Sequence, residues 1–319
     1  MRKEIIRFVK NIFVFSIFAL AFYIVAICLA GDFVTSKFTK NLIYNPGGAG
    51  YSLNRFEEVK SVKNVDILFL GSSHTYRGFD NRIFSNLPDR QAGNGFTNFN
   101  LGSSAQTPMQ TKVLLDRYLS RLNPKIVIYE VYPITFTLDG IESAMDLITN
   151  DQNDFASLKM SLHYNHIKTY NLLIYSSYRQ FFHQKNKTVG EIKIVNDRYI
   201  SGGFVEKIKS DFKPNPSKNQ KLIFNKDQLI VFQKNIESLI KNGTKVYLVQ
   251  APITSDHYNS FSNRSEFDSL MNSYGEYHDF NKMVNLTDSL HFFDAHHLNQ
   301  KGVEIFNKKL LEVIPFKRK

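Results

Sequence analysis

Residues 65–73 read VDILFLGSS, an apolar run that stops at a glycine followed by two serines. A short apolar run bounded by turn residues is consistent with a strand buried on both faces. Strands of this kind, alternating with helices, form parallel sheets that helices cover on both sides. Ligands of such sheets bind beyond the carboxyl ends of the strands, which is where Ser72 and Ser73 stand. The stretch therefore predicts a parallel α/β fold and places a serine hydroxyl at its binding edge.

The alternation of strand and helix continues to the end of the chain. Further candidate strands lie at 96–101, 125–132, 245–249 and 290–293, and candidate helices at 107–122, 228–241 and 301–313. Asn123-Pro124 ends the first of these helices, and Asn242-Gly243 ends the second. The pattern implies a short parallel sheet with a helical layer on each face.

Residues 136–222 interrupt this rhythm. They contain helical pieces at 156–163 and 172–183 and a polar stretch with two prolines at 209–220. We interpret the segment as an insertion, a cap over the strand ends that shapes a substrate cleft. The alternative is a peripheral addition with no role at the site.

The N-terminus carries the signal for localisation. Residues 1–10 are rich in Lys and Arg, and the next run, 12–30, has 19 residues without a charge. At 1.5 Å per residue this run covers about 28 Å, close to the thickness of a hydrocarbon core. Basic residues before the run predict a cytoplasmic N-terminus and an extracytoplasmic domain. A cleaved signal peptide is the alternative, because Cys28 and Ala30 are small residues at cleavage-like spacing.

These observations divide the chain into three parts. Residues 1–31 form a cytoplasmic basic tip and a single-pass membrane anchor, and 32–60 form a glycine-containing tether. Residues 61–319 form the α/β domain, with the cap inserted at 136–222.

Composition excludes some classes of function. The net charge of +11 fits nucleic acid, an anionic membrane surface or an acidic polymer, but export argues against nucleic acid. The single cysteine, Cys28, permits neither an internal disulfide nor a cysteine-based metal site.

A second stretch, FDAHHLNQKGV at 293–303, supplies partners for a nucleophilic serine. Serine attack needs a base, a group that orients the base, and donors for the oxyanion. Asp294 and His297 are three residues apart, a spacing that puts both side chains on one side of a turn entering a helix. The neighbouring His296 is expected to point elsewhere.

A zinc site is the alternative use of this stretch, because four ligand-type side chains fall within seven positions. They are His291, Asp294, His296 and His297. The serine at the other end of the chain makes this the weaker hypothesis, so we expect neither a metal nor another cofactor.

Residues 100–107, NLGSSAQT, follow the second candidate strand and open a helix. Backbone N–H groups at a helix N-terminus are natural donors to an oxyanion. Asn100 is either an amide that stabilises the turn or a residue of the site.

Together these three blocks resemble the GDSL/SGNH hydrolase superfamily, over residues 62–135 and 223–319. In the first block, G-D-S, the resemblance makes Ser73 the nucleophile and puts Ser72 at the aspartate position. The last block, D-x-x-H followed by L-N and Gly, matches Asp294, His297, Leu298, Asn299 and Gly302. The resemblance implies a Ser73–His297–Asp294 triad on a three-layer α/β sandwich with a short parallel sheet of flavodoxin-like order.

The chain departs from the family pattern in two places. The glycine that donates an oxyanion N–H is replaced by Ala105, whose N–H can act beside that of Ser73. The family's third block, G-x-N-D, has no counterpart after the strand at 126–130, so its asparagine donor is missing. Tyr132 or Thr135 could substitute for it.

Three further residues are expected to line the site: Asn100, Gly102 and His74. His74 directly follows the nucleophile, so its ring is expected to leave the site sideways and not to act as the base.

Within the superfamily, the anchor and the degraded third block resemble proteins that acylate surface polymers. These include the D-alanyl transfer protein of the teichoic-acid system and the alginate acetylation proteins. The resemblance implies a bacterial esterase or O-acyltransferase, in the periplasm or at the cell surface, that moves acyl groups of a carbohydrate or another ester. A membrane-bound O-acyltransferase is the implied partner. The alternative is a non-catalytic module of the same fold that binds surface polymer or the acyltransferase.

Overall fold

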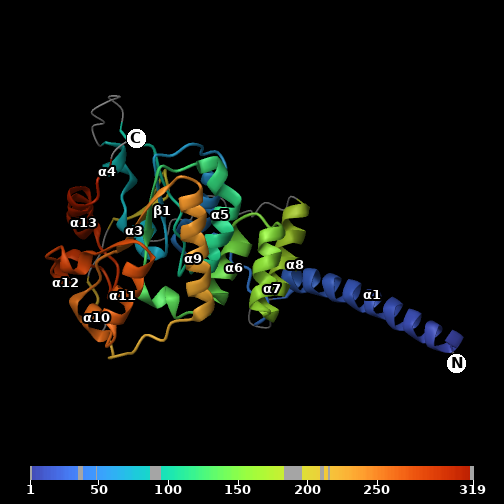
Figure 1. Ribbon diagram of the computed structural model, residues 1–319. Coiled ribbons are helices and arrows are strands. Elements are labelled where there is room, and N and C mark those ends of the chain that lie inside the picture. The colour runs from blue at the N-terminus through green and yellow to red at the C-terminus, as the bar shows by residue number, and fades with distance from the viewer. Residues whose placement is uncertain are drawn as a thin grey trace.

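The computed structural model describes residues 2–34, 39–47, 49–86, 95–182, 196–208, 212–214 and 216–316. The described residues form a five-stranded parallel sheet flanked by helices, with a long helix, α1 (Arg2–Phe33), projecting from one side (Figure 1). The strand order is β2-β1-β3-β6-β7. Counted within this sheet the order is 2-1-3-4-5, the flavodoxin-like order. The predicted fold class is therefore confirmed.

The sheet strands are β1 (Ile67–Leu70), β2 (Asn98–Asn100), β3 (Ile126–Glu130), β6 (Lys245–Gln250) and β7 (Glu276–Asp279). The first four match candidate strands. The predicted strand at 290–293 is wrong, because α12 (Asp288–His291) covers its first two residues. The last sheet strand is β7, whose sequence EYHD lacks an apolar run. An edge strand needs no such run, because β6 is its only neighbour in the sheet and three of its four residues are partly exposed.

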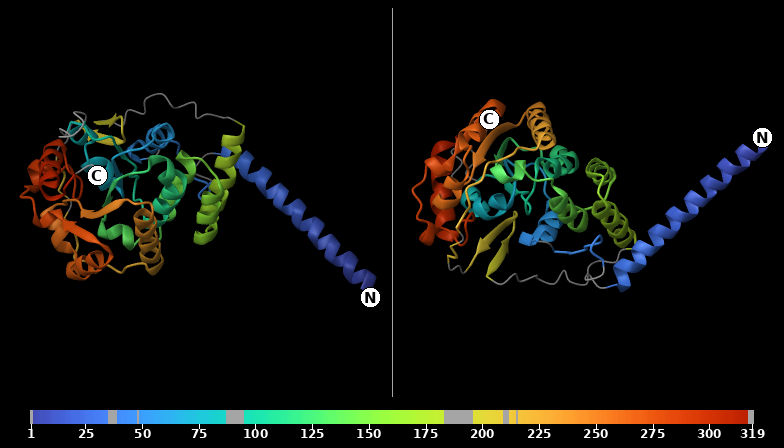
Figure 2. Two further views of the ribbon diagram at one scale, coloured as in Figure 1. Left: turned by 45° about the horizontal axis from the view of Figure 1, so that its top comes forward. Right: turned by 90° about the horizontal axis from the view of Figure 1, so that it is seen from below.

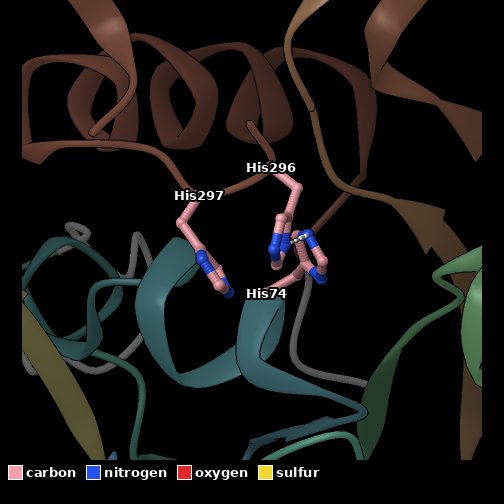
Figure 3. Close-up of side chains that lie close together, drawn as sticks. All are labelled: His74, His296 and His297. Atoms are coloured by element: carbon pink, nitrogen blue, oxygen red, sulfur yellow. Dashed lines mark hydrogen bonds between the residues drawn. The ribbon is translucent and has the colours of Figure 1, made fainter. Parts of the chain in front are cut away.

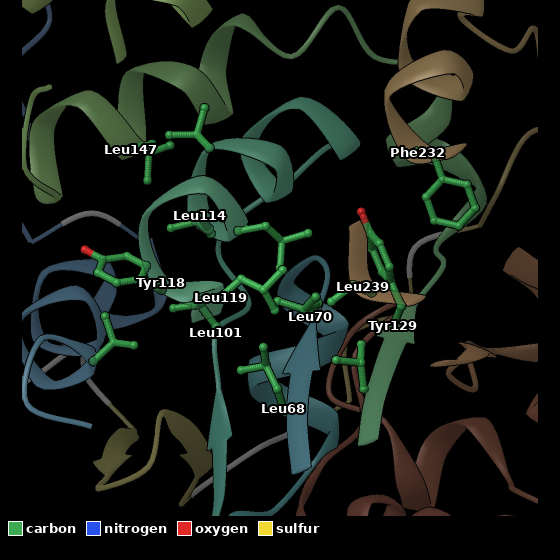
Figure 4. Close-up of a cluster of buried hydrophobic side chains, with 14 of the residues drawn as sticks. Leu68, Leu70, Leu101, Leu114, Tyr118, Leu119, Tyr129, Leu147, Phe232 and Leu239 are labelled. Atoms are coloured by element: carbon green, nitrogen blue, oxygen red, sulfur yellow. The ribbon is translucent and has the colours of Figure 1, made fainter. Parts of the chain in front are cut away.

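Two hydrophobic layers follow from the alternation of side chains along β1. Leu68 and Leu70 face α5 (Pro108–Leu122) and α9 (Lys226–Lys241), and Figure 4 shows this layer. Ile67 and Phe69 face the opposite layer, which includes Phe306 of α13 (Gln300–Val313). Because both faces are covered, all four residues of β1 are fully buried, as its apolar sequence predicts.

The described residues form further helices and two further strands. They are η1 (Ala49–Tyr51), α2 (Ser52–Val59), α3 (Ser73–Gly78), α4 (Asn81–Ser85), η2 (Pro133–Phe136), α6 (Ile141–Asn150), α7 (Phe155–Tyr164), α8 (Ile167–Phe181), β4 (Asp197–Ile200), β5 (Phe204–Lys207), α10 (Ser255–Ser260), α11 (Arg264–Tyr274) and η3 (Phe280–Lys282).

The predicted cap at 136–222 contains helices α6, α7 and α8 and the antiparallel hairpin β4–β5. Helices α6 and α7 pack beside α5, and α6 also packs beside α2, whereas α8 packs on α6, α7 and α1. The hairpin packs beside α3 (Figure 2). Residues 209–211 and 215 of the predicted polar stretch, and residue 183 of the predicted helix, lie outside the described residues.

The predicted tether at 32–60 differs from the structure in its second half. Helix α2 lies within it, and its Phe56 and Val59 are fully buried in the layer that contains Leu68. Their spacing of three residues puts both on one side of the helix. The helix was not predicted because it is only eight residues long, and two apolar residues three positions apart are too few to show a helical periodicity.

One helix within the described part of the chain, α1, is long and apolar enough to cross a membrane. Its apolar residues from Ile12 to Phe22 are exposed rather than packed in the domain. This exposure fits an anchor and does not fit a core helix of a soluble domain.

Candidate active site

The turn after β1 sets the position of the two serines. Gly71 has φ +136°, and a Cβ there would come within 2.7 Å of Glu130 and 2.6 Å of Thr75, so glycine is required by both conformation and space. Ser72 is the N-cap of α3, and its hydroxyl accepts the amide of His74 at 3.3 Å. Because Ser72 performs the capping role, the hydroxyl of Ser73 is left to other partners.

The structure brings Ser73, His297 and Asp294 together. The Oγ of Ser73 lies 2.8 Å from Nε2 of His297, and Nδ1 of His297 lies 2.8 Å from Oδ2 of Asp294. The other carboxylate oxygen of Asp294 accepts the amides of His296 and His297 at 2.9 and 2.8 Å. These two amide bonds fix the carboxylate, which in turn fixes the imidazole.

The loop that carries Asp294 and His297 is anchored at the start of α13. Asn299 is the N-cap of that helix, and its side chain accepts the amide of Gly302 at 3.1 Å. A Cβ on Gly302 would come within 2.3 Å of the carbonyl oxygen of His291. The L-N and Gly positions of the last block therefore shape the turn that presents the histidine.

The pKa values of the pair suit general-base chemistry. Burial lowers the pKa of His297, against the hydrogen bond and charge of Asp294, which raise it. Burial raises the pKa of Asp294. The hydrogen bond from His297 and the charge on the His297 imidazolium lower it by more, so the pKa of Asp294 lies well below its usual range. At neutral pH His297 is therefore a free base beside an ionised carboxylate.

The prediction that His296 points away from the site is wrong. Its ring lies 4.0 Å from the ring of His297 and 5.2 Å from that of His74 (centroid distances), and Figure 3 shows the three imidazoles side by side. The fixed Asp294 turn explains the error, because it holds the two consecutive histidines at the same edge. Burial, together with the nearby His297, lowers the pKa of His296 to about 3, so its ring is neutral.

His74 lies inside this cluster and not beside it. It is 4% exposed, its Nδ1 lies 3.0 Å from the Ser72 hydroxyl, and its Nε2 lies 3.3 Å from Nδ1 of His296. Burial and the other two imidazoles lower the pKa of His74 well below its ordinary value. As predicted, it makes no contact that would let it serve as the base of Ser73: its two nitrogens bond Ser72 and His296.

Glu130, at the end of β3, is a residue of the site that the sequence analysis did not identify. Its Oε2 accepts the amide of Ser72 at 3.0 Å and the hydroxyl of Ser72 at 2.8 Å, and lies 3.5 Å from the hydroxyl of Thr75. Burial raises the pKa of this carboxyl to about 7, against those hydrogen bonds. The sequence does carry a signal for Glu130, because a carboxyl side chain at the end of an otherwise apolar, buried strand is unusual and indicates a functional role.

A chain of hydrogen bonds therefore runs from Glu130 through Ser72 and His74 to His296. Ser72 has one hydroxyl hydrogen to give. When Glu130 is ionised it takes that hydrogen, so His74 donates from Nδ1 to Ser72 and accepts from Nδ1–H of His296. When Glu130 is protonated and donates to Ser72, every bond reverses and His296 carries its hydrogen on Nε2. The charge of Glu130 is thus coupled to the tautomer of His296.

Asn100 ties the second block to the nucleophile helix. Its side-chain amide donates to the carbonyl oxygens of Thr75 and Phe79 at 2.8 and 3.3 Å, and its Oδ1 accepts the amide of Gly102 at 3.2 Å. A Cβ on Gly102 would come within 2.6 Å of Thr75. Asn100 and Gly102 therefore allow close packing of the loop on α3, and the role of Asn100 is that of a turn-stabilising amide.

Ala105 adopts a left-handed conformation, with φ +48°. Ser104 and Ala105 border a cavity of about 320 Å³, whose other walls come from the segment between α1 and η1 and from α6. These other lining residues are Ile43, Asn45, Glu142, Ser143, Met145, Asp146 and Thr149. The predicted cap thus contributes a wall to a cavity beside the predicted oxyanion loop.

Tyr132 and Thr135 follow β3, where the sequence comparison with the SGNH pattern predicted a substitute for its missing asparagine. The ring of Tyr132 lies 4.2 Å from that of His74, and its hydroxyl lies 2.7 Å from Nε2 of His257. Thr135 is buried, and its hydroxyl donates to the carbonyl oxygen of Tyr132 at 2.7 Å. Tyr132 therefore packs against the imidazole cluster, and Thr135 supports the turn without reaching the site. His257 is a further neighbour of the cluster that the sequence did not single out.

The cluster also bears on the zinc hypothesis. Among the described residues, His74, His296 and His297 offer ligand atoms that all lie within 4.8 Å of one another. His291, from the predicted set, instead accepts the amide of Thr287 at 2.8 Å. An ion on the trio would need a nitrogen of His297, and both of its nitrogens already bond Ser73 and Asp294. The arrangement fits the triad better than it fits zinc.

No protein-family model matches the sequence, and no curated protein matches it. Three solved structures align over most of the chain. A proposed acylhydrolase from Bacteroides fragilis is 12% identical, with 81% of this chain and 92% of that chain covered and a TM-score of 0.39. A proposed platelet activating factor from Streptococcus pneumonia is 11% identical, with coverage of 82% and 94% and a TM-score of 0.40. An acetylxylan esterase from Geobacillus stearothermophilus, solved as a catalytic mutant, is 10% identical, with coverage of 82% and 99% and a TM-score of 0.41. Identity this low transfers no residue role, so the chemistry of the site follows from the contacts of this chain alone.

Proposed function

We propose that this protein is an extracytoplasmic serine esterase or O-acyltransferase that acts through Ser73, His297 and Asp294. The observation that carries the proposal is the pair of 2.8 Å contacts that join the three side chains in the order hydroxyl, imidazole, carboxylate. The neutral state of His297 supports it, because only the free base can accept a proton from Ser73.

In the proposed reaction, Ser73 Oγ forms a bond to the carbonyl carbon of an ester while its proton passes to Nε2 of His297. Asp294 holds Nδ1–H of the imidazole and stabilises the imidazolium. Collapse of the tetrahedral adduct breaks the bond to the leaving alcohol, which takes the proton from His297. Water or an acceptor hydroxyl then attacks the acyl-serine by the reverse sequence, and Ser73 is regenerated.

Two backbone N–H groups are proposed as donors to the oxyanion. Ser73 is the first residue of α3, and amides in the first turn of a helix have no partner within the helix. Ala105 supplies the second donor from the neighbouring loop. A missing asparagine donor can cost on the order of 10²–10³ in rate.

The proposed substrate is an acylated carbohydrate of the cell surface. Six of the nine residues that line the cavity beside Ala105 have hydroxyl, amide or carboxyl side chains, which offers hydrogen-bond partners to an acceptor or donor rich in hydroxyls. A sugar hydroxyl in place of water would turn the hydrolase into an O-acyltransferase, with a membrane-bound O-acyltransferase as the proposed partner.

The proposed location follows from α1. The basic residues before its apolar run favour a cytoplasmic N-terminus, which puts Ser73 outside the cytoplasmic membrane.

Labelling with a fluorophosphonate probe tests the nucleophile. The full chain in detergent is expected to label, and Ser73→Ala is expected to abolish labelling. Ser61→Ala, an exposed serine that bonds only its own turn, is the matched control and should label like the parent. Labelling that survives in Ser73→Ala would overturn the assignment.

The absent third-block asparagine favours one other function, a non-catalytic module that binds surface polymer or an acyltransferase. Turnover of p-nitrophenyl acetate that is lost in His297→Ala would exclude it. Mass spectrometry of an added acceptor glycan would then separate transfer from hydrolysis.

A further inference from the structure

Helices α7 and α8 form the side of the domain from which α1 projects (Figures 1 and 2). Helix α8 packs on the end of α1, where the hydroxyls of Tyr175 and Tyr178 donate to the two carboxylate oxygens of Asp32 at 2.9 and 3.1 Å. Gly31 lies directly against the ring of Tyr175. These contacts fix α8 at the level where the apolar run of α1 ends.

This helix pair carries a set of exposed apolar side chains. Phe155, Leu158 and Leu162 on α7 are 67%, 40% and 57% exposed, and Ile167 at the start of α8 is 45% exposed. We call these four residues the outer face. The three on α7 are spaced by three and four residues, so they lie on one side of that helix.

The outer face points away from the core of the domain. On α7, Met160 is buried and lies two residues from both Leu158 and Leu162, which is about 200° around the helix. On α8, Leu172 is buried and lies five residues from Ile167, about 140° around the helix. Each helix therefore buries one side in the domain and presents apolar residues on the side that faces away from it.

We propose that the outer face lies in the lipid–water interface of the membrane that α1 crosses. The proposal rests on the proposed anchoring by α1, because α8 is fixed to the end of that helix. Moving these four apolar side chains from water into the boundary of the bilayer is favourable in proportion to the apolar area that leaves water. Helices of this kind bury their apolar side in the headgroup–acyl boundary.

The position of Lys159 favours lipid, and not a close-packed protein, as the partner of the outer face. The exposed Lys159 on α7 holds its ammonium 4.6 Å from the centre of the Phe155 ring. A lysine beside an interfacial aromatic can extend its charge to the headgroups while its stem covers apolar surface. In a close-packed protein interface the same ammonium would have to be desolvated and paired.

Docking of this face has a consequence for the site. Helix α6, which lines the cavity beside Ala105, packs directly against α8. The bilayer would therefore hold that cavity close to the membrane surface, where a lipid-linked or membrane-delivered acyl donor could enter it.

Site-directed fluorescence on the full chain in liposomes tests the proposal. Cys28→Ser removes the single cysteine, and Leu158→Cys, Leu162→Cys or Ile167→Cys then carries the environment-sensitive dye NBD. Ile240→Cys, 60% exposed near the end of α9, is the matched control, and Phe15→Cys reports on the span itself. The vesicles contain phosphatidylcholine and phosphatidylglycerol with a nitroxide placed either near the headgroup or deep in the acyl chain. Circular dichroism checks that each variant is folded.

The proposal expects a blue shift of the dye at the three outer-face positions and quenching mainly by the shallow nitroxide. The dye at Ile240 should keep a water-like spectrum. A water-like spectrum at the outer face, with deep quenching at Phe15, would overturn the proposal while the anchor stands. Loss of quenching at Phe15 as well would overturn both. Shielding of the outer face only after other membrane proteins are added would identify a protein as its occupant and overturn the lipid assignment.

Discussion

The Oγ of Ser73 lies 2.8 Å from Nε2 of His297, although 224 positions separate the two residues in the sequence. The parallel sheet explains the meeting. Ser73 follows the carboxyl end of β1. His297 precedes α13, the helix that packs on the face of the sheet to which Ile67 and Phe69 of β1 point. Both therefore reach the edge at which α/β sheets bind their ligands.

Asp294→Asn should lower kcat for ester turnover by about 10³–10⁴ with little change in KM. The amide keeps the shape of the side chain but does not stabilise the imidazolium, and it permits the wrong tautomer of His297. Steady-state kinetics with p-nitrophenyl acetate measure the effect. Asp288→Asn, at the partly exposed start of α12, is a control that should leave kcat unchanged. Equal loss in both variants would point to a general defect of the loop.

Esterase activity should rise with pH through the pKa of His297, which burial holds below 6.5 against the pull of Asp294. The protonated imidazole cannot accept the proton of Ser73, so the acidic limb reports this one group. A pH profile of kcat/KM for the free enzyme measures it. An acidic limb with a midpoint above 6.5 would contradict the environment assigned to His297.

Glu130→Gln should remove a fall in activity above about pH 7. The pKa of Glu130 is raised to about 7, so above that pH a negative charge develops under Ser72 and opposes the oxyanion next to it. Glutamine keeps the hydrogen-bond acceptor for Ser72 and cannot ionise. The pH profiles of parent and variant should therefore coincide below neutrality and separate above it. A parent that shows no alkaline decline would refute this role.

The same carboxyl predicts a pH dependence of stability. Because folding raises the pKa of Glu130 from 4.5 to about 7, its contribution is fully present below pH 4.5 and is lost as pH rises through 7. The lost free energy of unfolding is about 3 kcal/mol. Urea denaturation of Glu130→Gln at pH 4.5 and 7.5 should show a smaller difference than the parent shows. Some slope should remain, because burial also raises the pKa of Asp146, to about 6.

Leu68→Ala should reduce the free energy of unfolding by about 2–5 kcal/mol, because Leu68 is fully buried between the sheet and the α5–α9 layer. Ile240→Ala removes an exposed side chain of similar size and should change stability by less than about 1 kcal/mol. Urea unfolding of both variants measures the difference. Similar values for the two would mean that this layer is not the core.

Much of the fold could be predicted from the sequence because its strands are buried on both faces and so are continuously apolar. β1 and β3 are strands of this kind, and both were placed within two residues. β7 was missed because an edge strand needs no apolar run, and α2 was missed because its two core residues, Phe56 and Val59, make too short a pattern. Local periodicity cannot distinguish such a pair from chance.

The candidate site divides in the same way. Ser73, Asp294 and His297 belong to short sequence motifs: Ser73 follows a strand and a glycine, and Asp294 and His297 are three residues apart. The structure brings the three side chains together. The positions of His296 and Glu130 depend on tertiary contacts: the Asp294 turn directs the first, and the register of β3 beside β1 places the second under Ser72. No local pattern encodes those contacts.

In the proposed reaction Ser73 carries the acyl group, and this intermediate can be trapped. The full chain is mixed with p-nitrophenyl acetate, quenched with acid and digested, and the peptides are sequenced by mass spectrometry. One acetyl group is expected on Ser73 of the parent, and none on His297→Ala after the same mixing time. An acetyl group on another residue, or its appearance on Ser73 at the same rate without His297, would contradict it.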